Sequence, residues 1–525
     1  MEELKSTTTS CLQWTLEDER EVSKLQIILR DEFRIKGNEK QAQIVKDVLG
    51  CLLKLIKEWV YNTALKRKLS LDIASKAGGD LYISGSFRLG IHESTGDIDA
   101  LCVVPTFVDR DEDFFGDFLN TLEAHPDIKE LRGIKDAYVP LIKMKFFGLE
   151  IDLLFARLRF EVVNNSLRDI KDDSILIGCD DQSISSLNAY RNNDIILSLV
   201  PNQEVFKTTL QLVKVWAKRR NLYSNKIGYL GGISWAILTA KVCQLFPSLP
   251  PNRLLQRFFT VFYKWNWHIP VLLCNIKEPM NLTIKQWNPK FNEGDQQQVM
   301  PIITPAFPCV NSAFNVCKIT KKIIIEEFHR AAKLTKKMNT LGFNWMQVYK
   351  KHDPFKSYTH FFRVDALSSS PEEHLKWSGF IESKFRLLIQ ELEVHSQDII
   401  DVRPHPKAFH TTNTEYKCCT TFLCGFRFRD LHKLQSYKQE YLVDLRAPIL
   451  KFCEKIMGLC HREEKSTNMR ITHATLGKLP IEVFEGGLRP LYQSSRRYIK
   501  SHKWIDQEIE RGVDEVIEDI EVVAK

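Results

Sequence analysis

Two aspartates at the start of an apolar run constrain the fold of this chain more than any other feature. Asp97 and Asp99 open residues 97–104, an apolar, β-branched run that predicts a buried strand. Because side chains alternate along a strand, the two carboxylates lie on the same face. Adjacent anions repel each other unless a cation neutralises them, and Mg²⁺ or Mn²⁺ is the usual cation among oxygen ligands. The run therefore predicts a metal site at the end of a strand.

Two further segments supply a phosphate-binding turn and a third carboxylate. Gly85 and Ser86 come shortly before the strand; glycine lets backbone N–H groups approach phosphate oxygens, and a serine hydroxyl can donate to them. Residues 137–145 and 149–155 predict a hairpin that carries Asp152. If the strand of Asp152 lies beside the two-aspartate strand, three carboxylates converge. A nucleoside triphosphate fits between the turn and such a metal site.

The composition narrows the class of protein. With 525 residues the chain is too long for one core and predicts about three domains. Lys and Arg exceed Asp and Glu by 74 to 66, a mild basic excess compatible with a polyanionic partner. The 13 cysteines show no zinc-binding spacing, which favours reduced thiols. No signal-peptide run and no apolar run of about 18 residues occurs, so we expect neither secretion nor a membrane span.

The segments around the strand predict helical scaffold. Residues 19–69 have helical periodicity, and one buried stripe is expected from Ile44, Val48, Leu52, Leu55 and Trp59. An apolar segment at 114–122 predicts a further helix. We expect the basic residues 66–68 and the acidic run 109–113 to be solvated helix ends.

A basic helix in the middle of the chain carries the second group of candidate residues. Lys214 and Lys218 are four residues apart on a predicted helix that ends at Arg220, so both can reach a triphosphate from one side, and the arginine pair at the helix end extends the positive charge. Tyr223 and Asn225 follow and offer a ring face and a hydrogen-bonding edge that suit a base. A solvated lysine face and a structural tyrosine are the alternatives.

The C-terminal third predicts an α+β domain. Residues 371–393 predict a long helix, and residues 421–429 predict a strand with two different faces. One face is apolar and the other basic: Phe422, Cys424, Phe426 and Phe428 against Arg427 and Arg429. An arginine face can bind RNA or be solvated, and the segment carries no aromatic-rich RNA-recognition signature.

In these motifs the chain resembles the nucleotidyltransferases built like DNA polymerase β and, within them, the nuclear poly(A) polymerases. The glycine–serine pair, the two-aspartate strand and the later lone aspartate occur in the family's order, and residues 213–225 and 231–236 are similar to its central domain. The resemblance implies a multidomain α/β and α+β fold: a polymerase β-like nucleotidyltransferase palm, a helical central domain and a C-terminal RNA-recognition-like α+β domain. These domains are expected over residues 36–183, 184–353 and 354–495, with an N-terminal segment at 1–35 and a tail at 496–525.

The resemblance also implies the roles of the site residues. Asp97, Asp99 and Asp152 would be catalytic and would hold two Mg²⁺ or Mn²⁺ ions. The lysines would contact the triphosphate, Tyr223 would stack near adenine and ribose, and Asn225 would help to read the base. The full set implied for ATP is Gly85, Ser86, Asp152, Lys214, Lys218, Tyr223, Asn225, Gly232 and Ile233.

The implied function is that of a polynucleotide adenylyltransferase, which adds AMP from ATP to RNA 3′ ends without a template and releases pyrophosphate. Implied partners are RNA, ATP and the pre-mRNA cleavage and polyadenylation machinery, for a nuclear monomer that does not bind a membrane. The alternatives are another terminal transferase, adding uridine or acting on transfer-RNA ends, and a catalytically silent RNA-binding regulator. The match over residues 223–235 argues against the first, and the intact aspartates with Lys214 argue against the second.

Three features depart from the family's pattern. Ser84 stands where an aromatic residue usually precedes the glycine–serine pair, which weakens ring packing against the substrate. Asn192 and Asn193 stand where the family carries a less polar pair, which alters the wall around the substrate. The sequence ends at Lys525 without the Ser/Thr-rich tail of the vertebrate nuclear enzymes, from which targeting and regulation are expected.

Overall fold

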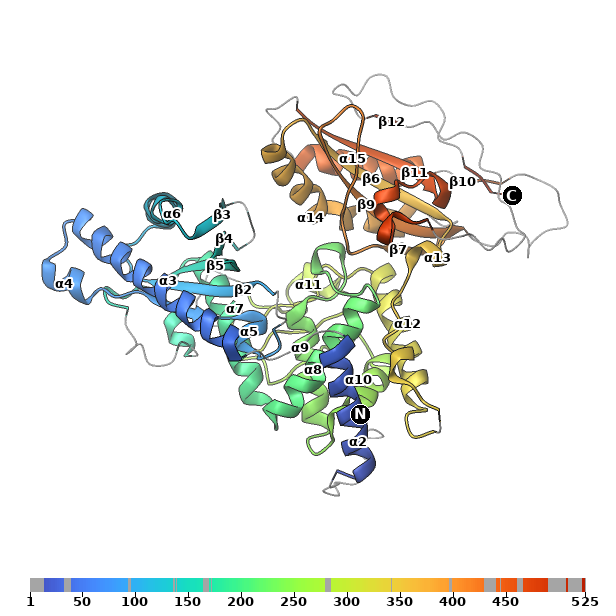
Figure 1. Cartoon of the computed structure of the whole chain (residues 1–525), viewed down its shortest axis with the longest axis horizontal. Helices are drawn as coiled ribbons and strands as arrows, with labels where there is room; N and C mark the ends of the chain where they lie inside the picture. The colour runs from blue at the N-terminus through green and yellow to red at the C-terminus, as the bar shows by residue number, and fades with distance from the viewer. Residues whose placement is uncertain are drawn as a thin grey trace.

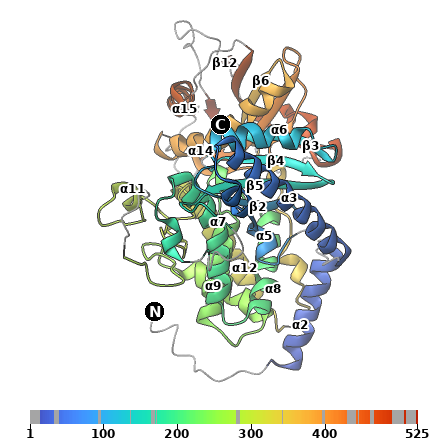
Figure 2. The same ribbon diagram turned by 90° about the vertical axis from the view of Figure 1, so that its left-hand side faces the viewer.

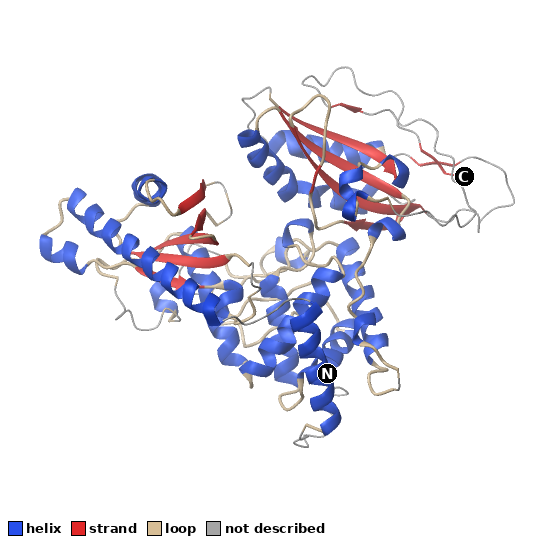
Figure 3. Ribbon diagram, viewed as in Figure 1, coloured by secondary structure: helices blue, strands red, loops and turns tan. Residues whose placement is uncertain are grey.

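The computed structural model describes residues 14–489 apart from short gaps, together with residues 507–508 and 522–524. The gaps are residues 33–38, 93–95, 136, 138, 164–169, 171, 279–284, 341, 396–398, 429–440, 444 and 460–465. The described chain forms two sheet-containing domains that flank a helical central domain (Figure 1, Figure 3). Seen from two directions at right angles, the C-terminal domain lies above the central helices (Figure 2). None of the described helices is long and apolar enough to cross a membrane.

The first domain, the palm, is built on a five-stranded mixed sheet in the order β1-β2-β5-β4-β3. β2 and β5 pair in parallel, and the other neighbours are antiparallel. The predicted two-aspartate strand and the predicted hairpin are therefore confirmed, whereas β3 was not predicted. The strands are β1 Asp80–Ile83, β2 Ile98–Val104, β3 Ile128–Ile134, β4 Leu141–Phe146 and β5 Leu149–Arg157.

Helices cover both faces of this sheet, which explains why β2 is apolar at successive positions. Ala100 and Cys102 pack with the long helix α3 (Glu39–Lys66), while Leu101 and Val103 pack with α7 (Asp181–Leu199). A strand buried on both faces has no polar side along its middle. Its polar residues can therefore stand only near its end, where the aspartates are.

The N-terminal helical region differs in detail from the prediction. It is divided into α2 (Leu16–Ile27), a π-helical turn η1 (Ile28–Glu32) and α3. Val48, Leu52 and Trp59 are buried as predicted, but Ile44 is 49% exposed. The buried row of α3 passes through Val45 instead, one position along the helix.

The basic and acidic runs predicted to be solvated helix ends meet each other instead. Asp113 is fully buried and lies 2.9 Å from Arg67, and Lys66 lies 2.6 Å from Asp117. The contact joins the end of α3 to η2 (Arg110–Phe118), which continues into α6 (Leu119–Glu123). This helical segment begins before residue 114 because the Asp109 carboxylate accepts hydrogen bonds from two backbone N–H groups of its first turn.

The central domain is a helical bundle around an aromatic core. The Trp216 ring lies 6.0 Å from that of Trp235 and 5.7 Å from that of Phe328, measured between centroids. The N-terminal helix α2 packs on α10 (Figure 1), where Asp18 lies 2.6 Å from Arg253. The main helices are α8 Gln203–Arg219, α9 Gly232–Leu245, α10 Pro251–Lys264, α11 Glu293–Gln296 and α12 Lys318–Thr335. Shorter elements of the first two domains are α4 Leu71–Lys76, α5 Gly85–Arg88, η3 Asp173–Leu176, η4 Asn225–Ile227 and η5 Trp345–Gln347.

The third domain has the predicted RNA-recognition-like α+β arrangement. Its main elements follow as strand, helix, two strands, helix and strand, and its sheet has the order β12-β11-β6-β9-β7. Both long helices pack on one sheet face, which carries the four predicted apolar residues of β9. Arg429 lies outside the described residues. The elements are α13 Pro354–Ser357, β6 His360–Ser368, α14 Pro371–His395, β7 Ile399–Pro404, β8 Phe409–His410, β9 Cys418–Phe428, β10 Tyr441–Val443, α15 Arg446–Leu459, β11 Thr467–Thr475, η7 Leu476–Lys478, η8 Ile481–Val483, η9 Glu485–Gly487, β12 Gln507–Glu508 and β13 Val522–Ala524.

A buried ionic cluster joins the central and third domains. Glu327 on α12 accepts two hydrogen bonds of 2.8 Å from Arg220 and one of 3.2 Å from Arg403 on β7. Burial opposes ionisation here, yet Arg220 and Arg403 lower the pKa of Glu327 to about 2. The expectation that Arg220 extends the basic face of its helix was therefore wrong, because this side chain is 7% exposed and turned toward Glu327.

Candidate active site

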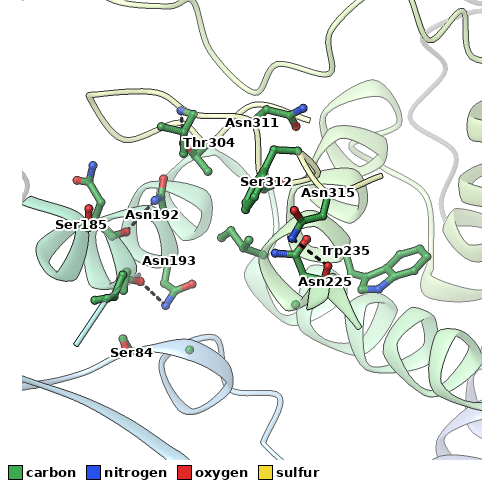
Figure 4. A pocket seen from close by; sticks show the side chains of 18 of the residues that line it. Ser84, Ser185, Asn192, Asn193, Asn225, Trp235, Thr304, Asn311, Ser312 and Asn315 are labelled. Atoms are coloured by element: carbon green, nitrogen blue, oxygen red, sulfur yellow. Dashed lines mark hydrogen bonds between the residues drawn. The ribbon is translucent and has the colours of Figure 1, made fainter. Parts of the chain in front are cut away.

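A cleft of about 1360 Å³ lies between the palm and the central domain, and α14 of the third domain contributes to its rim. Figure 4 shows the cleft with Asn192 and Asn193 of α7 on one wall and Asn225 and Asn315 on the other. The predicted residues Gly85, Ser86, Asp97, Asp99, Lys214, Lys218, Tyr223, Asn225, Gly232 and Ile233 all line it. Residues from sequence positions more than a hundred apart therefore share one cavity.

The three carboxylates lie together at one edge of the palm sheet. In the parallel pairing of β2 with β5, Asp99 stands directly opposite Asp152, and Asp97 comes immediately before β2. Lys143 on β4 pairs with Asp152 from the other side. Its Nζ lies 3.2 Å from Asp97 Oδ2 and 3.1 Å from Asp152 Oδ1. One ammonium group thus lies between two of the three anions.

The crowding of these carboxylates affects their ionisation. Burial, followed by the charges of Asp152 and Asp97, raises the pKa of Asp99 to about 6. Burial opposes the charge of Lys143, but the two aspartates that it contacts raise its pKa above the ordinary value. The site therefore carries more negative charge than the protein neutralises.

These residues fit a divalent cation site. Carboxylate oxygens are the ligands that Mg²⁺ and Mn²⁺ prefer, and the raised pKa of Asp99 indicates an unmet demand for positive charge. Among the described residues no three acidic, histidine or cysteine side chains lie close enough together to hold a metal ion as they stand, so binding would require the three carboxylates to move closer together. At this sheet edge Lys143 lies where it balances two of the carboxylates, so a bound cation would compete with its ammonium group.

The glycine–serine turn is shaped by its contact with the same strand. Gly85 has φ of +60°, and a Cβ atom there would lie 1.9 Å from Asp99 Oδ2. Only glycine fits, because both the left-handed backbone and the close carboxylate exclude a side chain. Ser84, which is 1% exposed, donates its backbone N–H to the Asp99 carbonyl at 2.8 Å.

The central-domain residues form the opposite part of the cleft. Lys218 Nζ lies 5.7 Å from the centre of the Tyr223 ring, and a Cβ atom on Gly232 would lie 2.8 Å from Tyr223 Oη. Gly232 thus allows the tyrosine to approach the start of α9. The Asn225 carbonyl accepts a 3.1 Å hydrogen bond from the Asn315 amide, whereas Asn225 Oδ1 is buried and accepts none from any described residue. This oxygen is an acceptor without a partner among the described residues, on a side chain that belongs to the cleft wall.

The asparagine pair of α7 has a structural place in the wall. Asn192 Oδ1 accepts from the Ala306 N–H at 2.9 Å, and its amide donates to the Asn188 carbonyl at 2.7 Å. Asn193 donates to the Ala189 carbonyl at 3.1 Å. These bonds fix the wall that the two side chains form.

Sequence reasoning missed Lys143 beside the carboxylates, and it missed basic residues that line the cleft, among them Lys384 and Arg386 on α14. A signal for Lys143 existed. Residues 142–146 alternate apolar and basic, which places Lys143 on one face of a strand, and that strand lies next to the strand of Asp152. The two α14 residues carry no such signal, because they lie about 150 residues beyond Ile233, the nearest predicted site residue, and only the domain arrangement brings them near.

Three family models match the chain in succession. These are the poly(A) polymerase nucleotidyltransferase domain over residues 10–200, the poly(A) polymerase central domain over 205–351 and the poly(A) polymerase predicted RNA binding domain over 353–418. A poly(A) polymerase of Dictyostelium discoideum is 38% identical over 472 residues, covering 89% of this chain and 57% of the relative. Nuclear poly(A) polymerase 2 of Arabidopsis thaliana is 34% identical over 502 residues, which cover 95% of this chain and 61% of the relative. The chain thus spans roughly three fifths of the relatives it matches. A crystal structure of the Cid1 poly(U) polymerase aligns with 64% of this chain and 100% of its own, at 14% identity and a TM-score of 0.43.

Proposed function

The chain belongs to the poly(A) polymerase family, and on that premise we propose that it adds AMP from ATP to RNA 3′ ends without a template, releasing pyrophosphate. The placement of Asp97, Asp99 and Asn225 in one cleft, with Asp152 opposite Asp99 on the neighbouring strand, carries this proposal. The carboxylates supply a cation site for phosphoryl transfer, and Asn225 supplies an acceptor for a base.

In this proposal Asp97, Asp99 and Asp152 hold divalent metal, Mg²⁺ or Mn²⁺. When bound, two such ions neutralise the triphosphate and lower the pKa of the attacking 3′-hydroxyl. Without metal, Lys143 offsets part of the repulsion among the carboxylates through its contacts with Asp97 and Asp152. Gly85 gives the phosphates close access to the backbone beside Asp99.

The central-domain residues bind the nucleotide. Lys214 and Lys218 contact the triphosphate from one side of α8, and the Tyr223 ring stacks on the base or ribose. Asn225 Oδ1 accepts from the exocyclic amino group of adenine, a group that uracil lacks. Gly232 and Ile233 shape the wall next to Tyr223. Selection of ATP over UTP follows from this hydrogen-bond pattern.

We extend two further properties from the relatives. Three relatives from Arabidopsis thaliana are named nuclear poly(A) polymerases, and we propose that this chain acts in the nucleus on pre-mRNA, together with the cleavage and polyadenylation machinery. The third domain, matched by a predicted RNA-binding model, would hold the RNA.

Primer extension tests the proposal. The purified chain is incubated with labelled oligo(A), Mg²⁺ or Mn²⁺, and each nucleoside triphosphate separately; a product ladder with ATP is expected. Asp152→Asn should remove the ladder, and Glu150→Gln, an exposed carboxylate on the same strand, should retain it. A ladder of equal length with UTP would identify a uridylyl transferase instead. RNA binding without extension under both metals would identify a silent regulator.

A further inference from the structure

Phe314 is an exposed aromatic side chain inside the cleft that the proposed function leaves without a role. It is 54% exposed and lines the cavity, whereas its neighbours Ala313 and Val316 are 1% and 6% exposed in the central core. An isolated exposed apolar residue is ordinary on a protein surface. Phe314 differs from such residues because it lines the cleft and because its neighbours in the chain are fixed in the central core.

The segment that carries Phe314 is held on both sides. Asn311 Oδ1 accepts from the backbone N–H groups of Ile302 and Ala313, at 2.9 Å each. On the other side the Asn315 amide donates to the Asn225 carbonyl at 3.1 Å (Figure 4). The ring is therefore presented to the cleft by a fixed backbone, which lowers the entropy lost when a ligand stacks on it.

Phe314 lies between the nucleotide pocket and the third domain. Asn315, next in sequence, contacts Asn225 of the pocket, and Cys317 is buried in the core of the third domain. Ile227, two residues after Asn225, is buried in that core as well. A strand of RNA that leaves the nucleotide pocket toward the third domain passes this ring.

The surroundings of the ring are basic. The described lining of the cleft includes six lysine and arginine side chains and three aspartates, two of which belong to the carboxylate site. Lys226, Lys384 and Arg386 stand where the central domain meets α14, and Lys226 lies 2.9 Å from Glu382 across that junction. Basic side chains around an aromatic platform are the arrangement by which proteins bind single-stranded nucleic acid.

The sheet face of the third domain is not available for this purpose. Phe361 and Leu423 on that face are each 1% exposed, because Leu479, Val483 and Phe484 of the following segment pack on them. Arg427, an RNA-binding candidate from the sequence, lies 3.1 Å from Asp401 and stacks over another ring of the same domain. The third-domain residues that line the cleft come from helix α14 instead.

We propose that Phe314 is the stacking platform for a base close to the 3′ end of the RNA, and that Lys226, Lys384 and Arg386 attract the adjoining phosphates. The proposal rests on the proposed function, since it names how the same site holds its polymer substrate. The ring positions RNA and takes no part in the chemistry at the carboxylates.

The test is a set of variants at one position, with kinetics and binding measured separately. Phe314→Ala should raise the KM for oligo(A) about 5- to 150-fold, the range for loss of one stacked base, with the KM for ATP and kcat within about twofold of the parent. Phe314→Trp should restore the affinity, whereas Phe314→Leu, apolar but without a ring, should behave like the alanine variant. Tyr263→Ala removes an exposed aromatic residue outside the cleft and should change neither KM.

Equilibrium binding separates stacking from charge. Titration of labelled oligo(A) without nucleotide, at several salt concentrations, should show weaker binding for Phe314→Ala at an unchanged salt slope. Lys384→Ala should reduce the slope by about 0.7, the value for one phosphate on a single strand. Point variants are used because removal of the third domain would expose Ile227 and Cys317.

The outcomes distinguish this inference from the function on which it rests. If the parent protein extends oligo(A) and Phe314→Ala or Phe314→Leu binds RNA as tightly as the parent, the stacking role is wrong. An increase in the KM for ATP alone would place the ring against the incoming nucleotide and would also overturn the proposal. If the parent extends no primer, the proposed function fails, and the binding titration still decides whether Phe314 contacts RNA.

Discussion

Replacement of Asp99 by asparagine should stabilise the metal-free protein while removing nucleotide addition. The pKa of this carboxyl is raised from 3.8 to about 6 by burial and by the charges of Asp152 and Asp97. Ionisation of Asp99 therefore destabilises the folded state. Asparagine keeps the shape of the side chain and removes the charge. It also removes a ligand from the proposed metal site, which explains the opposite effect on activity.

The size of the effect follows from the pKa shift. At neutral pH a rise in the pKa from 3.8 to about 6 corresponds to about 3 kcal/mol of lost stability, an upper value because the carboxyl is partly open to the cleft and solvent screens its charge. We expect about 1 to 3 kcal/mol, which for a domain of this size is roughly 2 to 10 °C in Tm. The sign depends on pH. The folded state binds the proton more tightly than the unfolded state, so the charge penalty is absent below the unfolded pKa and grows as pH rises through the folded value.

The assay is thermal melting of parent and variant in chelator between pH 4 and 8. The difference in Tm should be near zero at pH 4 and complete by about pH 7, given the folded pKa of about 6. Added Mg²⁺ should raise the Tm of the parent more than that of Asp99→Asn. Glu150→Gln on β5 is the control and should melt like the parent throughout. An Asp99→Asn protein that melts at or below the parent temperature at pH 7 in chelator would refute the account of carboxylate crowding.

Four further substitutions have defined outcomes. Gly85→Ala should abolish primer extension, because its Cβ would displace the Asp99 carboxylate and the left-handed backbone adds about 1 to 2 kcal/mol. Lys214→Ala should raise the KM for ATP more than that for RNA, since it removes one charge-assisted phosphate contact. Asn225→Ala should lower the preference for ATP over the other nucleotides by about 1 to 3 kcal/mol, measured as a ratio of kcat/KM. Glu327→Gln should cost about 3 to 5 kcal/mol and loosen the third domain, detected by melting and limited proteolysis.

Control variants test the predictions for Gly85 and Glu327, and specific kinetic results would contradict those for Lys214 and Asn225. Gly148→Ala tests a glycine with φ of +82° and no atom within 4 Å of the added Cβ, so retained activity there assigns the Gly85 effect to the clash. Glu326→Gln changes an exposed neighbour of Glu327 and should leave melting unchanged. An unchanged KM for ATP would assign Lys214 to scaffold. Unchanged nucleotide selectivity would mean that the base is recognised by groups other than Asn225.

The elements that form the carboxylate site could be predicted because their signals are local. The apolar, β-branched residues after Asp99 indicate a buried strand. In the hairpin that carries Asp152, apolar and polar residues alternate along both strands. β3 was missed because most of its residues are exposed, which leaves no apolar alternation to detect. The prediction that Ile44 is buried on α3 was wrong, because helical periodicity does not distinguish neighbouring positions at the edge of a buried face.

The remaining errors concern residues whose environment is set by distant parts of the chain. Arg220 follows a lysine-bearing helix, and its sequence context predicts an exposed cation. Its side chain is buried at the domain junction because it binds Glu327, 107 residues further along the chain. Lys143 resembles a solvated strand residue until β4 is placed beside Asp152. Burial of a charged side chain depends on finding an opposite charge, and single-sequence patterns contain no information on that partner.

The parallel register of β2 and β5 links catalysis to correct folding. A slip of one residue between these strands would turn Asp152 to the opposite face and bring Ile151 or Leu153, both fully buried, toward the cleft. Such a chain would lose apolar burial and the third carboxylate at the same time. The specific activity of a refolded preparation therefore reports the fraction of molecules whose palm sheet has assembled in register, including molecules whose secondary-structure content looks native by spectroscopy.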